Sequence, residues 1–236
     1  MALTNESPQA ARAIGTLNEK PLHAALKAWY AQPGDRFEVA VDGFVIDIVR
    51  GDLLVEIQTG NFASIARKLA ALAARHPVRL VYPVARQKWI VRVTPDGRTR
   101  LSCRKSPRQG VVEQVFVELV HIPHLLAEPR FSLDVLLIEE EELRCYDGAR
   151  GWRRRGWVTF ERRLIRVVDQ RRFETPADLG ALVPATLAGP FTTADLADAL
   201  SGSRRLAQKM AYCLRKMGAI TPAGKRGNAA LYTRSA

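Results

Sequence analysis

Two acidic residues stand inside short runs of strand-forming residues, where a carboxylate is unusual. Asp47 interrupts the apolar run of residues 44–49, and Glu56 interrupts the run of residues 53–58. Gly51-Asp52 lies between the runs and suits a two-residue hairpin turn, and the register set by such a turn places Asp47 opposite Glu56. Cβ atoms at facing positions lie about 4.5–5.5 Å apart, and like charges there repel. The sequence therefore predicts two carboxylates that need a shared cation.

A third acid extends this pair. The turn Asp42-Gly43 places Glu38 opposite Asp47 on the preceding strand. A carboxylate in an apolar sheet is costly unless it is paired, and no Lys or Arg occupies the neighbouring positions of this face. Mg²⁺ (or Mn²⁺) takes carboxylate oxygens together with waters and phosphates. We therefore expect a metal site at Asp47, Glu56 and Glu38, the alternative being a sheet edge with its acids in solvent.

The elements that must position these acids form an α/β pattern. Hydrophobic periodicity and turn residues predict a helix, a three-strand meander, a second helix and further strands, which together make a mixed sheet with flanking helices. The predicted helices cover residues 19–32, 62–75 and 111–126, and the predicted strands cover residues 37–41, 44–49, 53–59, 78–84, 89–93 and 131–138.

Residues 16–95 resemble the PD-(D/E)XK nuclease superfamily, the restriction-endonuclease-like fold. The resemblance rests on a first helix that bears Glu, the meander, Asp47 in its second strand, and Glu56-Ile57-Gln58 in its third. It implies that Asp47 and Glu56 bind catalytic Mg²⁺ and position the attacking water. It also implies a catalytic role for Glu19 in the first helix, although Glu19 could instead form a capping box with Thr16.

Gln58 departs from the superfamily pattern, because Lys is usual at this position. Gln can orient a water but supplies no positive charge to the developing phosphate. Two functions therefore stay open at this stage. The first is a Mg²⁺-dependent deoxyribonuclease in which Gln58 joins Asp47, Glu56 and Glu19. The second is a non-catalytic DNA-binding regulator with a degenerate nuclease fold.

Charge is distributed unevenly along the 236 residues. The chain has 36 Lys plus Arg against 24 Asp plus Glu, for a net charge of +12. Residues 1–147 hold 19 basic and 18 acidic side chains, whereas residues 148–236 hold 17 and 6. We expect a flexible lead-in at residues 1–15, a nuclease-like domain at residues 16–147 and a basic DNA-binding domain at residues 148–236. The basic excess indicates a nucleic-acid partner, with anionic lipid or acidic proteins as the rival partners.

The C-terminal region resembles a winged helix-turn-helix domain. A capped helix at Thr192, a turn at Ser201-Gly202, a basic helix from Arg204 and a basic-tipped hairpin follow one another. In such a domain the second helix enters the major groove and the hairpin touches the backbone. The residues expected to bind DNA are Arg204, Arg205, Gln208, Lys209, Lys225, Arg226, and Arg153, Arg154 and Arg155 between two tryptophans.

Composition excludes several other classes. No apolar run approaches the ~20 residues of a membrane span, and the N-terminus lacks the apolar stretch of a signal peptide. The three cysteines form no Cys-x-x-Cys pair, so neither a disulfide framework nor a structural zinc site is supported. We expect a soluble cytoplasmic protein whose partner is DNA and not a membrane. A homodimer is compatible with this expectation.

Overall fold

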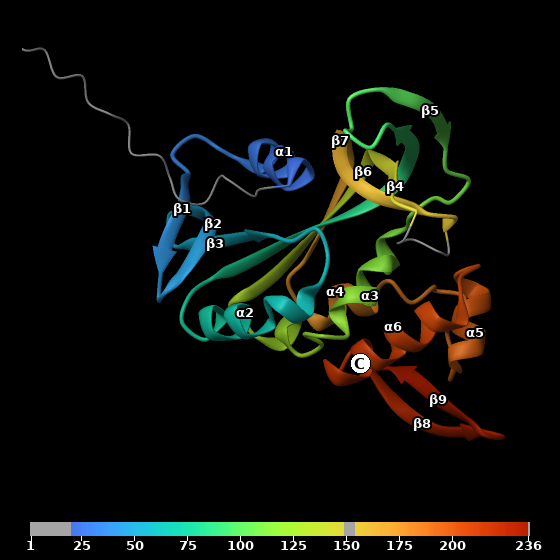
Figure 1. The fold of residues 1–236 in the computed structure, drawn as a ribbon. Helices are drawn as coiled ribbons and strands as arrows, with labels where there is room; N and C mark the ends of the chain where they lie inside the picture. The colour runs from blue at the N-terminus through green and yellow to red at the C-terminus, as the bar shows by residue number, and fades with distance from the viewer. Residues whose placement is uncertain (1–19, 149–153, 236) are drawn as a thin grey trace, which may run out of the picture.

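A computed structural model describes residues 20–148 and 154–235 (Figure 1). The α-helices and strands, in chain order, are α1 Pro21–Tyr30, β1 Arg36–Val41, β2 Phe44–Arg50, β3 Leu53–Ile57, α2 Ala66–Ala73, β4 Val78–Val93, β5 Arg100–Lys105, α3 Phe116–Leu119, β6 Phe131–Tyr146, β7 Trp157–Phe173, α4 Pro176–Gly180, α5 Thr193–Ala199, α6 Arg204–Lys216, β8 Ile220–Arg226 and β9 Ala229–Arg234.

A seven-stranded mixed sheet forms the centre of the protein. Its main order is β1-β2-β3-β4-β6-β7, with β5 paired to β4. The meander β1-β2-β3 is antiparallel, whereas β3 runs parallel to β4 and β4 runs parallel to β6. The predicted class, an α/β protein with a mixed sheet and flanking helices, is confirmed. The two strands predicted at residues 78–84 and 89–93 are one strand, β4, because a bulge near Arg86 lets it continue instead of ending.

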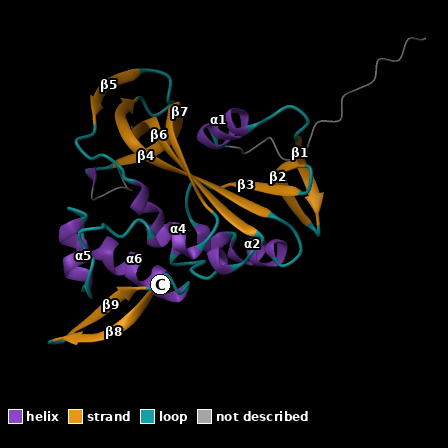
Figure 2. Ribbon diagram, turned by 180° about the vertical axis from the view of Figure 1, so that it is seen from behind, coloured by secondary structure: helices purple, strands orange, loops and turns teal. Residues whose placement is uncertain are grey.

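The helices cover the two faces of the sheet unequally. Helix α1 begins with Pro21, whose missing N–H is tolerated in a first turn, and buries Leu22, Leu26 and Tyr30 against one face. Helices α2 and α3 lie on the other face, where Figure 1 labels both, and the view from behind shows α1 and α2 on opposite sides of the sheet (Figure 2). The helix predicted over residues 111–126 is instead two 3₁₀ turns around the four-residue α3, because Pro123 stops a continuous helix.

The sheet continues past the domain boundary expected near Gly148. Strands β6 and β7 form a long antiparallel hairpin, and Gly148 lies at its tip. Three arginines of β7 pair with acids of β6: Arg162 with Glu140, Arg166 with Glu139, and Arg172 with Asp134. The sheet unit therefore extends to Phe173, and part of the basic excess after residue 147 neutralises the acids of β6.

The C-terminal elements pack against the α3 side of the sheet. Thr192 forms the predicted capping box at α5, and Ser203 caps α6 by accepting the Leu206 N–H. Helix α6 buries Met210 and Leu214 in one apolar cluster with residues of α3 and the sheet. The two predicted regions therefore share a continuous core.

Asp134 of β6 is fully buried at the interface between the sheet and α1. Its carboxylate accepts hydrogen bonds from Tyr30 Oη at 2.5 Å, Gln170 Nε2 at 2.6 Å and Arg172 Nε at 2.8 Å. Burial acts to raise the pKa of Asp134, but the contacts with Arg172 and Tyr30 outweigh it and hold the pKa below its ordinary value. Asp134 thus joins α1, β6 and β7.

We predict that Arg172→Ala destabilises the fold by about 2–3 kcal/mol, because it removes the cationic partner of a buried carboxylate. Urea unfolding measures the change. The difference in free energy of unfolding between variant and wild type should become smaller as the pH falls. The pKa of Asp134 is lower in the folded state than in the unfolded state, so its ionised form stabilises the fold fully above the unfolded-state pKa. This stabilisation is lost once the pH falls below the folded-state pKa.

The matched control is Arg171→Ala on the same strand. Arg171 pairs with the exposed Asp169, at 3.6 Å, so its removal should change stability by less than about 0.5 kcal/mol. Equal effects of the two substitutions would contradict the role given to Asp134.

Candidate functional site

Asp47 and Glu56 lie side by side on β2 and β3. The ladder pairs Ile48 with Val55, and the same register brings Asp47 beside Glu56. Asp47 Oδ2 accepts the backbone N–H of Ile57 at 2.8 Å, which holds the carboxylate against the end of β3. The structure therefore brings together the two acids that the sequence singled out.

The two carboxyl groups have opposite electrostatic environments. Glu56 is 5% exposed, and burial, followed by the charge of Asp47, raises its pKa to about 7. Burial also acts to raise the pKa of Asp47, but contacts with His23, the Ile57 N–H and Lys68 outweigh it and leave that pKa below its ordinary value. Asp47 is therefore ionised at neutral pH, whereas Glu56 titrates close to it.

Two partners of these acids come from helices and were missed by the sequence analysis. Lys68 of α2 places its Nζ 2.6 Å from Glu56 Oε1 and donates a hydrogen bond to the Val45 carbonyl. His23 of α1 places its Nε2 3.2 Å from Asp47 Oδ2. Among the described residues, no Lys or Arg of the neighbouring strand positions pairs with the two acids; the cation comes from α2, which packs against the meander on its way to β4. The only sequence signal is the position of Lys68 in the helix that follows Glu56.

A cleft of about 660 Å³ opens beside Asp47 and is called the Asp47 cleft below. Its lining combines cations, acids and backbone from five separate segments: Lys20, His23, Glu38, Asp47, Gln58, Thr59, Gly60, Asn61, Ser64 and Arg162. Gln58 donates a hydrogen bond to the Asn61 carbonyl at 3.3 Å, and Arg162 donates one to the Thr59 carbonyl at 3.2 Å. The cleft therefore offers polar groups of both signs around one ionised carboxylate.

Glu38 lines the Asp47 cleft on the strand next to Asp47. The β1–β2 ladder pairs Phe37 with Ile48 and Val39 with Ile46, and this register places Glu38 opposite Asp47, as predicted, although Glu38 itself has a φ of +54° and forms no ladder pair. The Glu38 side chain forms an ion pair with Lys27 of α1. Within residues 20–148 and 154–235, no group of three or more His, Cys, Asp or Glu side chains is placed to hold a metal ion. A metal site at Asp47, Glu56 and Glu38 stays a prediction.

The remaining predicted residues fall into three groups. Glu19 and Arg153 lie outside the described residues. Arg204, Arg205, Gln208 and Lys225 are exposed on α6 and at the hairpin tip. The others have partners within the chain: Lys209 donates to the Val117 carbonyl, Arg226 pairs with Asp195, Arg154 pairs with Glu142, and Arg155 lines a basic pocket beside Trp157.

Comparison with known proteins identifies relatives of the chain. Residues 20–174 match the model of a family described as "Domain of unknown function (DUF8091)". A protein of Treponema pallidum (strain Nichols), described as an uncharacterized protein, is 33% identical over 221 residues, which is 93% of this chain and 86% of that protein. No solved structure matches the chain significantly. The family match ends where β7 ends, in agreement with a sheet unit that reaches Phe173.

No helix among the described residues is long and apolar enough to cross a membrane.

We predict that Asp47→Asn lowers the pKa of Glu56 and that Lys68→Met raises it above about 7. The first change removes a neighbouring negative charge, and the second removes the cation that stabilises ionised Glu56. The ¹³C chemical shift of the Glu56 carboxyl, followed through a pH titration, reports both changes. Asp52→Asn, in the exposed β2–β3 turn, is the matched control and should leave the pKa of Glu56 unchanged. An unchanged pKa of Glu56 in the Asp47→Asn variant would disprove the coupling between the two acids.

Proposed function

We propose that this chain, a member of the DUF8091 family, is a metal-dependent nuclease that hydrolyses phosphodiester bonds in DNA. The observation that carries the proposal is the adjacent pair of Asp47, which is ionised and lines the Asp47 cleft, and Glu56, which is buried beside it and has a pKa of about 7. Carboxyl groups with perturbed pKa values at a cleft are candidates for a functional site.

The order of the elements supports a restriction-endonuclease-like fold. A helix, a three-strand meander, a crossover helix and a strand parallel to the third strand follow one another as α1, β1 to β3, α2 and β4. This is the order on which the resemblance to the PD-(D/E)XK superfamily rests. The two acids occupy the second and third strands, as the resemblance implies.

The acids fit a Mg²⁺ or Mn²⁺ ion held through two carboxylates. Asp47 Oδ1 accepts no hydrogen bond from the described residues, while Oδ2 is held by Ile57 and His23. Mg²⁺ usually takes one or two carboxylates and completes its shell with waters and phosphate oxygens, so a third acid is not required. A bound ion would polarise the phosphate and supply an activated water.

Lys68 supplies the positive charge that Gln58 lacks. Its Nζ contacts Glu56 from α2, so the basic group next to the second acid comes from the helix and not from the strand. Arg162 and Lys20 line the same cleft and can bind phosphate oxygens. Gln58 remains able to orient a water. The departure of Gln58 from the family pattern therefore does not by itself argue against activity.

A non-catalytic DNA-binding regulator is the second candidate. Gln58 and the ion pair that ties Glu38 to Lys27 favour it, because both weaken a metal site. A regulator would bind DNA but show no Mg²⁺ or Mn²⁺ affinity that depends on Asp47.

The C-terminal elements support a DNA-binding module of the winged-helix type. Helices α4, α5 and α6 precede the β8–β9 hairpin, and Phe191 bridges to Tyr232 of β9 beside them. Helix α6 buries one stripe and exposes Arg204, Arg205 and Gln208 on the other. Lys209 and Arg226 serve internal contacts, so Arg204, Arg205 and Lys225 are the stronger DNA contacts.

We predict that the protein cleaves DNA with Mg²⁺ or Mn²⁺ and that Asp47→Asn or Glu56→Gln reduces the rate by at least about 100-fold. Cleavage of single-stranded, duplex and branched DNA, assayed on gels, measures the effect. Asp52→Asn makes the same chemical change at the exposed turn and should retain full activity. Undiminished cleavage by either site variant would reject the nuclease site at Asp47 and Glu56. If the protein does not cleave DNA and Asp47→Asn leaves its metal binding unchanged, the regulator is favoured.

We predict that replacing Arg204, Arg205 and Lys225 together by Ala weakens duplex binding and lowers the slope of log K against log salt by about one for every phosphate that the variant no longer neutralises. Fluorescence anisotropy at several salt concentrations measures both quantities. The control replaces Arg36 and Arg67, which are exposed and have no ion-pair partner among the described residues. Equal weakening in the two variants would show that net charge, and not this surface, governs binding.

A further inference from the structure

A second, strongly basic hollow lies where β4, β5 and β6 continue beyond β3. It consists of a cleft of about 510 Å³ and an adjoining one of about 360 Å³, which share Ile90, Arg104, Arg144 and Arg154 in their linings. We call this continuous surface the basic groove. The linings of the basic groove and of the Asp47 cleft have no described residue in common, and Figure 1 shows β5 well away from β1, so the two surfaces are distinct.

The charge of the basic groove is one-sided. Seven cations line it, and Glu142 is the one carboxylate in the described part of its lining. Glu142 is 4% exposed, and its carboxylate forms ion pairs with three of these cations: Lys88 Nζ at 2.7 Å, Arg144 Nε at 2.7 Å and Arg154 Nη1 at 3.3 Å. One carboxylate therefore holds three cations in place without neutralising them, which leaves a preorganised site for anions.

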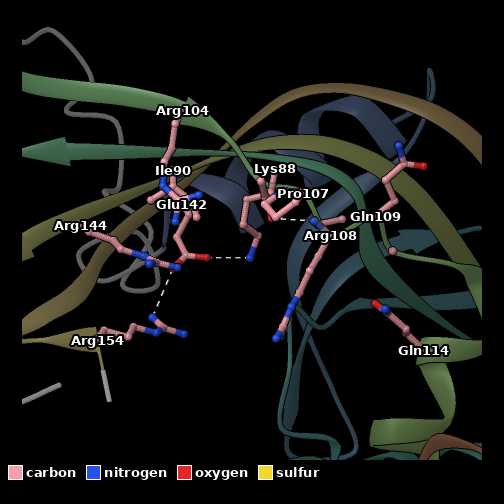
Figure 3. A pocket seen from close by; sticks show the side chains of 13 residues that line it. Lys88, Ile90, Arg104, Pro107, Arg108, Gln109, Gln114, Glu142, Arg144 and Arg154 are labelled. Carbon is pink, nitrogen blue, oxygen red and sulfur yellow. Dashed lines mark hydrogen bonds and ion pairs between the residues drawn. The ribbon is translucent and has the colours of Figure 1, made fainter. Parts of the chain in front are cut away.

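Other cations of the basic groove have no acidic partner. Arg104 and Arg108 are exposed, and neither forms an ion pair with a described residue. Figure 3 shows Lys88, Arg108, Arg144 and Arg154 directed toward a common space from different segments of the chain. Cations that converge on one space and outnumber their carboxylate partners repel each other unless an anion joins them. The ligand is therefore expected to carry several negative charges.

Aromatic rings extend the basic groove at one end. The Arg92 guanidinium lies 4.5 Å from the centre of the Trp157 ring, and Tyr146 packs edge-on against Trp157 with ring centres 5.8 Å apart. Tyr146 is 56% exposed. A cationic path that leads to exposed rings is the arrangement that binds single-stranded nucleic acid, through phosphates along the path and stacked bases at the rings.

A chain of ion pairs connects the basic groove to the Asp47 cleft. Arg162 lines the Asp47 cleft and pairs with the fully buried Glu140 at 2.6 Å, and Glu140 also contacts Lys88 of the basic groove at 3.0 Å. The two surfaces are therefore neighbours that share one buried network. A strand bound along the groove would be led toward Asp47 and Glu56.

We propose that the basic groove binds a single-stranded segment of nucleic acid and presents it to the Asp47 cleft. The presentation rests on the nuclease function proposed above, whereas the binding does not. The two adjoining clefts, of about 510 and 360 Å³, accommodate a few nucleotides of one strand, and stacking on the rings of Trp157 and Tyr146 requires bases that are unpaired. Single-stranded DNA, or the unpaired part of a branched substrate, is therefore the substrate class that the structure favours.

The test measures binding without cleavage, in EDTA, by fluorescence anisotropy with a single-stranded oligonucleotide of about 12 nucleotides. Arg104→Glu with Arg108→Glu should weaken binding by at least about tenfold, because both cations face the groove and neither stabilises the fold through an ion pair. Tyr146→Ala, which removes an exposed ring, should weaken it by several-fold. Arg36→Glu with Arg67→Glu makes the same change of net charge outside the groove and should have an effect below about threefold.

Competition experiments separate the alternatives. Inorganic phosphate or a mononucleotide that displaces the oligonucleotide at equal concentration would overturn the proposal in favour of a small-anion site. A duplex that competes as well as the single strand, or a control variant that binds as weakly as the groove variant, would also overturn it. If the protein binds single strands tightly but does not cleave them, the nuclease function is rejected and binding by the basic groove is retained. If the protein cleaves DNA but the groove variant binds single strands as tightly as the wild type, the role of the basic groove is rejected and the nuclease function is retained.

Discussion

Burial of carboxylates inside an apolar sheet is the constraint on which this structure depends. Asp134 and Glu140 are fully buried, and Glu56 and Glu142 are nearly so. An unpaired charge at such a position would cost several kcal/mol, so each acid must obtain partners from elsewhere in the chain. These partners come from α1, α2, β4 and β7, and they fix how those elements sit on β6 and β3. The acids therefore organise both the sheet and its functional surfaces.

This constraint changes the meaning of the net charge. Part of the positive charge that follows residue 147 lies on β7, where Arg162, Arg166 and Arg172 form ion pairs with acids of β6. Among the described residues, exposed cations gather on the stripe of α6 and in the basic groove. On sequence grounds a net charge of +12 favours a polyanionic partner, which stays a prediction; the structure shows which cations are paired within the chain.

Local features were predicted from sequence with success. The meander, its two Gly-containing turns, the neighbouring positions of Asp47 and Glu56, and the cap at Thr192 all depend on contacts between residues close in the chain. Predictions failed where distant residues intervene. β4 continued through a bulge because β6 pairs with it along its length, and the sheet extended to Phe173 because β6 and β7 pair and form ion pairs with each other.

The sequence by itself determined the α/β class, the meander and the two facing acids, because turn residues and the two-residue period of strands set register locally. Only the tertiary structure decided that Lys68 and His23 accompany those acids, that Lys209 and Arg226 serve internal contacts, and that Lys88, Arg104, Arg108, Arg144 and Arg154 converge in one groove. The physical reason is that charges are paired through space. Which cation reaches which carboxylate depends on where helices return over the sheet, and spacing along the chain does not carry that information.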